Sequence, residues 1–266
     1  MNRIDAKFRA LKAAGRKAFI PYVSAGDPDD ATTVEIVLAL ERSGADLVEL
    51  GVPYSDPLAD GPVIQDAFTR VLSRGFRLAD TWKIARRIRE RTDIPLLAMV
   101  SYSLVYRYGA EKFLTEAMSA GIDGAVLPDL TVEEGGALLD GAAARDFATV
   151  MLVAPTTELG RERAIVARST GFIYCISVVG ITGERESLPP ELREHVKRLR
   201  KLTTKPICVG FGVSRPEHVK TVAEIADGVI VGSAIVKLIA GHTDDRRKML
   251  DELARFTSAL TEPLRQ

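Results

Sequence analysis

Residues 46–62 of the 266-residue chain read DLVELGVPYSDPLADGP. The stretch starts with a short apolar run, residues 46–52, and passes into a loop that contains three prolines and two aspartates. A run of this length bounded by turn residues is typical of a buried strand. Seven further runs rich in Val, Ile and Leu follow the same pattern: residues 18–25, 96–101, 124–128, 149–154, 172–178, 206–211 and 228–231.

Stretches with helical periodicity separate these runs, and the alternation predicts a parallel sheet wrapped in helices. Eight units in 266 residues average about 33 residues each, close to the roughly 30 that a strand and its crossover helix need. No linker rich in Pro, Gly or Ser divides the chain. We therefore predict an α/β protein with a single (β/α)8 TIM barrel that spans residues 1–266 as one domain.

Some segments exceed this repeat. Residues 2–14 place Ile4, Phe8 and Leu11 on one helical face, which predicts an extra N-terminal helix that closes the floor of the barrel. The long connection between the second and third runs has room for two helices, at residues 62–73 and 79–91. Additional helices are also expected after the eighth strand.

The composition excludes several classes of protein. The 36 basic and 36 acidic side chains cancel, so the basic excess of a nucleic-acid binder is missing. The chain has no apolar run long enough to span a membrane and no signal-peptide pattern, so we predict a cytoplasmic protein. Cys175 and Cys208 lie inside apolar runs without metal-ligand spacing, which favours buried reduced thiols over a disulfide or a zinc site.

Glu49 interrupts the apolar run at residues 46–52. A carboxylate inside a barrel strand is costly to bury, so its pKa should be perturbed, as in a general acid or base. The alternative is a solvated or ion-paired glutamate near the strand end. The rigid loop that follows could hold Asp56 or Asp60 over the barrel mouth, although turn formation alone would also explain these two aspartates.

Glycines follow the last two predicted strands, at Gly210 and Gly212 and again at Gly232 before Ser233. The loops after strands seven and eight are the recurrent phosphate site of such barrels, although a tight turn would also explain each glycine. The loop at residues 179–190 is long and polar and begins with glycine hinges, so it is either a mobile lid or an excursion without function.

The chemistry can be narrowed further by what is missing at strand ends. The three histidines lie in helical or post-helical segments, and no lysine ends a strand. This disfavours metal-dependent and Schiff-base mechanisms. The remaining groups are carboxylates, backbone donors and the aromatic side chains Tyr22, Tyr174 and Phe211. They suit acid-base chemistry on an aromatic phosphate ester.

Several motifs occur in the order found in one known family. They are the segment from Glu49 to Pro62, Ser24-Ala25-Gly26-Asp27-Pro28, Gly180-Ile181-Thr182-Gly183, Gly210-Phe211-Gly212-Val213 and Gly232-Ser233-Ala234-Ile235-Val236. Over nearly its whole length the chain resembles tryptophan synthase alpha chains. The resemblance implies retro-aldol cleavage of indole-3-glycerol phosphate to indole and D-glyceraldehyde 3-phosphate in L-tryptophan biosynthesis. It further implies an alpha2-beta2 assembly, in linear alpha-beta-beta-alpha order, whose beta chain carries pyridoxal phosphate and joins indole to serine; the alpha chain itself needs no cofactor.

The resemblance also implies roles for individual residues. Glu49 would be the acid/base at the substrate's C3 and side-chain hydroxyl, and Asp60 would hydrogen-bond the indole N–H. Thr182 would bond Asp60 when the lid closes. The other implied positions fall into three groups: Tyr22, Tyr174 and Phe211 in the indole pocket, Gly183, Gly212, Gly232 and Ser233 around the phosphate, and Pro53 and Asp56 facing the beta chain.

Two motifs depart from the family pattern. Ser101-Tyr102-Ser103 stands where the family commonly has Tyr-x-Asn after strand three, and Thr131 replaces the last proline of Pro-Asp-Leu-Pro after strand four. Three other functions stay open at this point. They are a stand-alone indole-3-glycerol-phosphate lyase that releases free indole, a catalytically silent regulatory barrel, and a phosphosugar isomerase or aldolase on the same scaffold.

Overall fold

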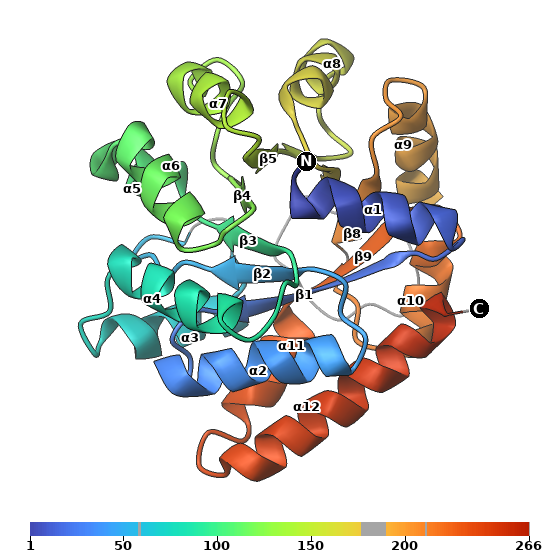
Figure 1. Ribbon diagram of the computed structural model, residues 1–266. Coiled ribbons are helices and arrows are strands. Elements are labelled where there is room, and N and C mark those ends of the chain that lie inside the picture. Colours follow the sequence, from blue (N-terminus) through green and yellow to red (C-terminus); the bar gives the residue numbers. More distant parts are fainter. Residues whose placement is uncertain (58–59, 177–189, 211, 266) are drawn as a thin grey trace.

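The computed structural model describes residues 1–266 except 58–59, 177–189, 211 and 266. Its strands form a central ring with helices packed around the outside (Figure 1). The strands are β1 (Ala18–Ser24), β2 (Val48–Gly51), β3 (Leu96–Met99), β4 (Gly124–Val126), β5 (Ala148–Val150), β6 (Leu152–Val153), β7 (Ile173–Ile176), β8 (Ile207–Gly210) and β9 (Gly228–Val231). The helices are α1 (Arg3–Ala13), α2 (Asp30–Arg42), α3 (Pro62–Leu72), α4 (Leu78–Arg89), α5 (Tyr102–Tyr108), α6 (Ala110–Ser119), α7 (Gly136–Ala143), α8 (Leu159–Arg168), α9 (Pro190–Arg200), α10 (Pro216–Ala223), α11 (Ser233–Ala240) and α12 (Arg246–Thr261), followed by the 3-10 turn η1 (Glu262–Leu264).

The sheet order is β5-β4-β3-β2-β1-β9-β8-β7-β6, and each described pairing is parallel. The two outermost strands, β5 and β6, are consecutive in the chain and separated only by Met151, so the sheet curves into a nearly closed barrel. They are the two halves of the single run predicted at residues 149–154. Because every strand points the same way, all carboxyl ends meet at one rim.

The predicted barrel is confirmed, with the extra N-terminal helix and the additional helices after β2 and after the last strand, β9. The predicted strands were one or two residues too long at several ends, where the apolar pattern continues into the adjoining loops. Sequence reasoning did not single out the pair α5 and α6, which together fill the connection after β3. Gly109 separates these two helices and has a φ of 92°, a backbone conformation that residues with a Cβ rarely adopt.

Helix α1 closes the amino-terminal end of the barrel. Its buried face, Ile4, Phe8 and Leu11, packs in one cluster with inward side chains of the strands. The Phe8 and Phe172 rings lie 5.6 Å apart between centroids. Asn2 caps the helix and donates from Nδ2 to the main-chain oxygen of Asp123, just before β4, at 2.7 Å. The sequence-based expectation that this helix plugs the floor is therefore confirmed.

Three aspartates complete this floor. Asp46, Asp123 and Asp227 each precede a strand. Each carboxylate accepts a hydrogen bond from the N–H of the first or second residue of the neighbouring strand, at 2.8–3.1 Å. A buried strand start leaves a donor that needs a partner, and these carboxylates supply it. Their repetition at equivalent positions explains acidic residues at the start of apolar runs without invoking function.

A buried polar network lies outside the barrel between β7, α8 and α9. The Glu162 carboxylate, fully buried, contacts His195 Nε2 and Arg198 Nε, both at 2.9 Å. Burial raises the pKa of the Cys175 thiol to about 12, so its S–H stays protonated and faces His195 Nδ1 at 3.5 Å. The thiol can then donate to Nδ1 while Nε2–H donates to Glu162. Both cysteines are buried free thiols, as predicted.

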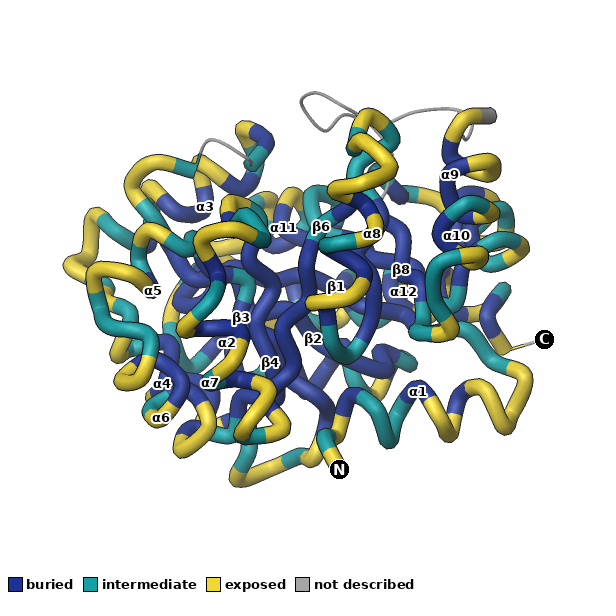
Figure 2. Tube along the Cα trace, turned by 90° about the horizontal axis from the view of Figure 1, so that it is seen from above, coloured by how far each residue is buried: buried dark blue, intermediate teal, exposed yellow. Residues whose placement is uncertain are grey.

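Burial follows the layers of the fold. The strands in the centre are buried, whereas the surrounding helices alternate between buried inner and exposed outer faces (Figure 2). Within the described ranges, no helix combines the length and the apolar character needed to cross a bilayer.

Candidate active site

Glu49 lies on the inward face of β2. It follows the inward Leu47 by two residues and pairs in register with Tyr22 of β1 and Leu97 of β3. Its side chain is fully buried, and neither carboxylate oxygen has a hydrogen-bond partner among the described residues. Burial raises its pKa from 4.5 to about 8, because an unpaired charge is poorly solvated there. The alternative of a solvated glutamate is therefore wrong, and the described part of the chain offers Glu49 no ion pair.

Asp60 approaches the same region from the rim loop. Its main-chain N–H donates to the main-chain oxygen of Pro57 at 3.0 Å, and its main-chain oxygen accepts from Gln65 Nε2 at 2.8 Å. These two bonds tie the loop to the first turns of α3. Pro62 begins that helix, and its ring preorganises the helical backbone. Burial raises the pKa of the Asp60 carboxyl to about 6. Two carboxyl groups with raised pKa values therefore belong to adjacent parts of the chain, on β2 and just after it.

Tyr22 covers the end of β2. A Cβ built on Gly51 would lie 1.9 Å from the Tyr22 hydroxyl oxygen, so the ring occupies the place that a larger residue would fill. Burial raises the pKa of Tyr22 well above its usual value, and the nearby charge of Asp60 raises it further. The hydroxyl is buried without a hydrogen-bond partner among the described residues. It is thus a neutral donor beside the carboxyl pair.

Replacing Gly51 with Ala will displace the Tyr22 ring and lower the free energy of unfolding by about 1–3 kcal/mol, the usual effect of overpacking a core. Chemical denaturation measures the change. Gly160→Ala is the matched control, because a Cβ there meets nothing within 4 Å and alanine favours a helix. Unchanged stability of Gly51→Ala would contradict this close packing of Tyr22 on Gly51.

Tyr174 occupies the opposite wall in the same manner. A Cβ built on Gly210 would lie 2.9 Å from its hydroxyl oxygen and from its ring carbon Cε1. Burial raises the pKa of Tyr174 well above its usual value, and the nearby charges of Glu49 and Asp60 raise it further. Gly51 and Gly210, the last residues of β2 and β8, therefore make room for two tyrosine rings. Both rings lie near the same two carboxyl groups, Glu49 and Asp60.

A cavity of about 180 Å³ opens at the carboxyl-terminal rim, and of these four groups Tyr22 and Asp60 line it. Its wall includes Tyr22 and Asp60 and extends over the ends of β3 and β4. The remaining lining residues are Val52, Tyr54, Asp56, Pro57, Phe68, Met99, Val100, Ser101, Ser103, Pro128 and Asp129. A mostly apolar wall with a few polar groups is suited to a flat aromatic ligand.

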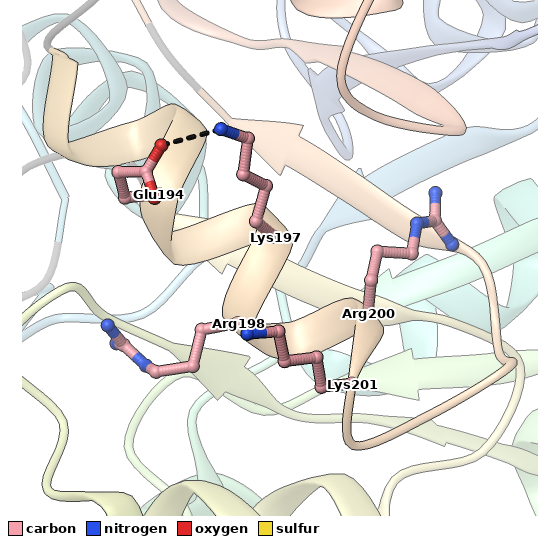
Figure 3. Close-up of a pocket in the computed structure, with 5 residues that line it drawn as sticks. All are labelled: Glu194, Lys197, Arg198, Arg200 and Lys201. Carbon is pink, nitrogen blue, oxygen red and sulfur yellow. Dashed lines mark hydrogen bonds and ion pairs between the residues drawn. The ribbon is translucent and has the colours of Figure 1, made fainter.

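A second hollow, of about 520 Å³, lies along α9 (Figure 3). Its lining residues are Glu194, Lys197, Arg198, Arg200 and Lys201. Arg198 is paired with the buried Glu162 and Arg200 with Asp227, while Lys197 contacts Glu194 on its own helix. These are side chains of one surface helix whose charges are largely matched, so we assign the chemistry to the cavity near Glu49.

Comparison with known proteins shows the family of this chain. The family model described as tryptophan synthase alpha chain matches residues 8–264. The chain belongs to the tryptophan synthase alpha chain family. The alpha chain of Thermoanaerobacter sp. (strain X514) is 46% identical, and the alignment covers 99% of this chain and 100% of the relative.

Solved structures extend the similarity to the fold. The tryptophan synthase subunit alpha of Legionella pneumophila has a TM-score of 0.91 and 34% identity, over 99% of this chain and 98% of that one. A chain from the tryptophan synthase a2b2 complex of Pyrococcus furiosus, described in a study of its mutual activation, has a TM-score of 0.85 and 37% identity. That match covers 92% of this chain and 98% of the other.

The structure describes some of the other positions that the family resemblance implied, whereas others lie outside the described residues. Gly232 precedes α11, whose first turn has no side-chain cap, and Ser233 begins that helix, so both lie where a phosphate could be bound. Gly212 is half-buried after β8. Thr182, Gly183 and Phe211, and nearly all of the predicted lid at 179–190, lie outside the described residues.

The two positions implied to face the beta chain differ in exposure. Pro53 is buried, whereas Asp56 is exposed and lines the rim of the cavity. Asp56 is therefore the one of the two whose side chain can meet a partner directly. Sequence reasoning did not name Phe68 of α3, Ser103 or Asp129 as cavity walls. Ser103 and Asp129 lie just past predicted apolar runs, which was the available signal, whereas Phe68 lies in a predicted helix and gave none.

Proposed function

We propose that this alpha chain cleaves indole-3-glycerol phosphate to indole and D-glyceraldehyde 3-phosphate. The observation that carries the proposal is Glu49, a fully buried carboxyl without a partner among the described residues, whose pKa of about 8 keeps it protonated near neutral pH. A general acid is most effective when its pKa lies near the working pH. Membership of the family supports the substrate.

Glu49 then acts twice. As an acid it donates its proton to C3 of the indole ring, and the ring becomes a cationic indolenine. As a carboxylate it takes the proton of the side-chain hydroxyl, and the bond between C3 and the side chain breaks. The bonding electrons return to the ring and neutralise its nitrogen, so indole and an aldehyde are released. Glu49 ends protonated, and no external acid, base or oxidant is consumed.

Asp60 meets the charge that develops on the ring nitrogen. Its carboxylate accepts the indole N–H and stabilises the cation formed when C3 is protonated. Tyr22 and Tyr174, both neutral because of their raised pKa values, bound the ring without competing for that charge. Gly212, Gly232 and Ser233 hold the phosphate with main-chain N–H groups and the start of α11. The family resemblance assigns Thr182, Gly183 and Phe211 to the same site, and these three lie outside the described residues.

We further propose that indole passes to a beta chain in an alpha2-beta2 assembly, like the a2b2 complex of tryptophan synthase from Pyrococcus furiosus. The beta chain would hold pyridoxal phosphate and join indole to serine, while this chain needs no cofactor of its own. Pro53 and Asp56 belong to the loop that would transmit the partner's state, and the complex would work in the cytoplasm.

Indole release by the purified chain will be slow and will rise at least about tenfold when a matching beta chain is added, because association biases the chain toward its catalytic conformation. A titration of indole release against beta-chain concentration measures this effect. Fast indole release whose rate does not change when the beta chain is added would instead identify a stand-alone lyase. No release under either condition would reject the proposed function.

A further inference from the structure

The cavity lined by Tyr22 and Asp60 has a polar outer end that the proposed cleavage reaction does not use. Ser101 continues the inward alternation of Leu97 and Met99 on β3, and it lines the cavity together with Ser103 and Asp129. The neighbouring wall is apolar, formed by Val52, Phe68, Met99, Val100 and Pro128. A polar group at the end of an apolar pocket generally selects one part of a ligand.

Hydrogen bonds hold this end in place. The Ser101 hydroxyl donates to Asp129 Oδ2 at 2.6 Å and accepts from the Ser103 N–H at 3.2 Å. The Tyr102 N–H donates to Asp129 Oδ1 at 2.6 Å. The Asp129 carboxylate therefore has a fixed orientation and retains free acceptor lone pairs. Such a pair accepts hydrogen bonds, so its complement is a hydroxyl or amino group.

The order of the strands tells which part of the substrate reaches this end. The candidate phosphate residues follow β8 and β9, whereas Ser101 and Asp129 follow β3 and β4. Tyr22 on β1 and Glu49 on β2 lie between the two groups in the sheet. A substrate with its phosphate at β8 and β9 and its reacting carbon at Glu49 directs the far edge of its ring toward β3 and β4.

We propose that Ser101 and Asp129 are specificity-determining residues that accept indole rings with a hydroxyl or amino substituent on the benzene ring. The inference rests on the proposed lyase function and refines its substrate class. Serine at position 101 is small, so it leaves space in the cavity for such a substituent, and its hydroxyl orients Asp129.

The test is the reverse reaction, condensation of glyceraldehyde 3-phosphate with ring-substituted indoles. It uses the full chain together with its beta chain, and no free serine is added to the assay. Each hydroxyindole, substituted at position 4, 5, 6 or 7, is compared with the methylindole of the same position, because the two substituents are similar in size. We expect at least one hydroxyl isomer to exceed its methyl counterpart about tenfold in kcat/KM, the effect of a hydrogen bond to a charged group.

Three variants separate specificity from folding. Ser101→Ala will bring the hydroxyl-to-methyl ratio close to one, Ser101→Thr will keep the preference, and Ser101→Tyr will exclude both substituted rings relative to indole. Equal kcat/KM for every hydroxyl and methyl pair in the unaltered protein, or an unchanged ratio in Ser101→Ala, would overturn the inference. Failure to condense unsubstituted indole would reject the lyase function itself, which is a separate result.

Discussion

Indole release from indole-3-glycerol phosphate will fall at least about a thousandfold when Glu49 is replaced by Gln, the scale of a lost general acid-base group. Glutamine has nearly the same shape but neither donates a proton to C3 nor takes one from the hydroxyl. Because Glu49 has no hydrogen-bond partner among the described residues, the substitution breaks no contact there. Substrate binding should therefore survive.

Single-turnover indole release with a saturating beta chain measures the chemical step, and calorimetry with the substrate measures binding to the inactive variant. Gly160→Ala serves as the control, since Gly160 is exposed on α8 and far from any packing conflict. Activity within about tenfold of the unaltered chain would show that another group carries the proton. Loss of both cleavage and binding would assign Glu49 to substrate binding.

The same substitution will stabilise the folded chain, increasingly so as pH rises. Below about pH 4.5 the Glu49 carboxyl is protonated in both folded and unfolded chains. Between pH 4.5 and about 8 the unfolded chain ionises while the folded chain keeps the proton, so the folded state loses stability. Above pH 8 the loss is complete. With about 1.4 kcal/mol for each pKa unit, it amounts to roughly 3–5 kcal/mol.

Glutamine does not titrate, so Glu49→Gln escapes this loss. The difference in free energy of unfolding between the variant and the unaltered chain should be small at pH 4.5 and rise to its full value by pH 8.5. Denaturant titrations across that range measure it, and the other titrating groups cancel in the difference. A difference independent of pH would contradict the burial of an unpaired carboxyl.

Glu162→Gln is the informative comparison, because Glu162 is equally buried but paired with His195 and Arg198. Replacing a partner of a buried ion pair leaves the other charge poorly compensated, which commonly costs several kcal/mol. This variant should be destabilised near neutral pH, opposite in sign to Glu49→Gln. The opposite signs of the two stability changes would thus distinguish a carboxyl that serves the chemistry from one that stabilises the fold.

The elements of the fold could be predicted because each depends on a local pattern. Short apolar runs bounded by turn residues predict strands, and the apolar face of residues 2–14 predicts the floor helix. The split of the fifth run at Met151 could not be predicted, because it is the place where the barrel closes. Closure depends on how every strand twists and pairs, which no single run records.

The candidate site divides in the same way. Glu49 was recognisable as a charge inside an apolar run, and the glycines after the last strands marked a phosphate site. By contrast, the contact between Tyr22 and Gly51 joins two strands, and the cavity joins Phe68 on α3 with Ser101 and Asp129 after β3 and β4. These residues lie far apart in the chain and show no shared pattern.

The sequence by itself determined the order of the apolar runs and of most helices, and which carboxyl is out of place in its strand. Only the tertiary structure decided that this carboxyl is unpaired among the described residues and that its pKa is raised. It also decided that Tyr22, the neighbour of Glu49 in the sheet, lines a cavity with a polar end. The physical reason is that periodicity is a property of one segment. Desolvation and hydrogen bonding instead depend on every group that the closed barrel brings near.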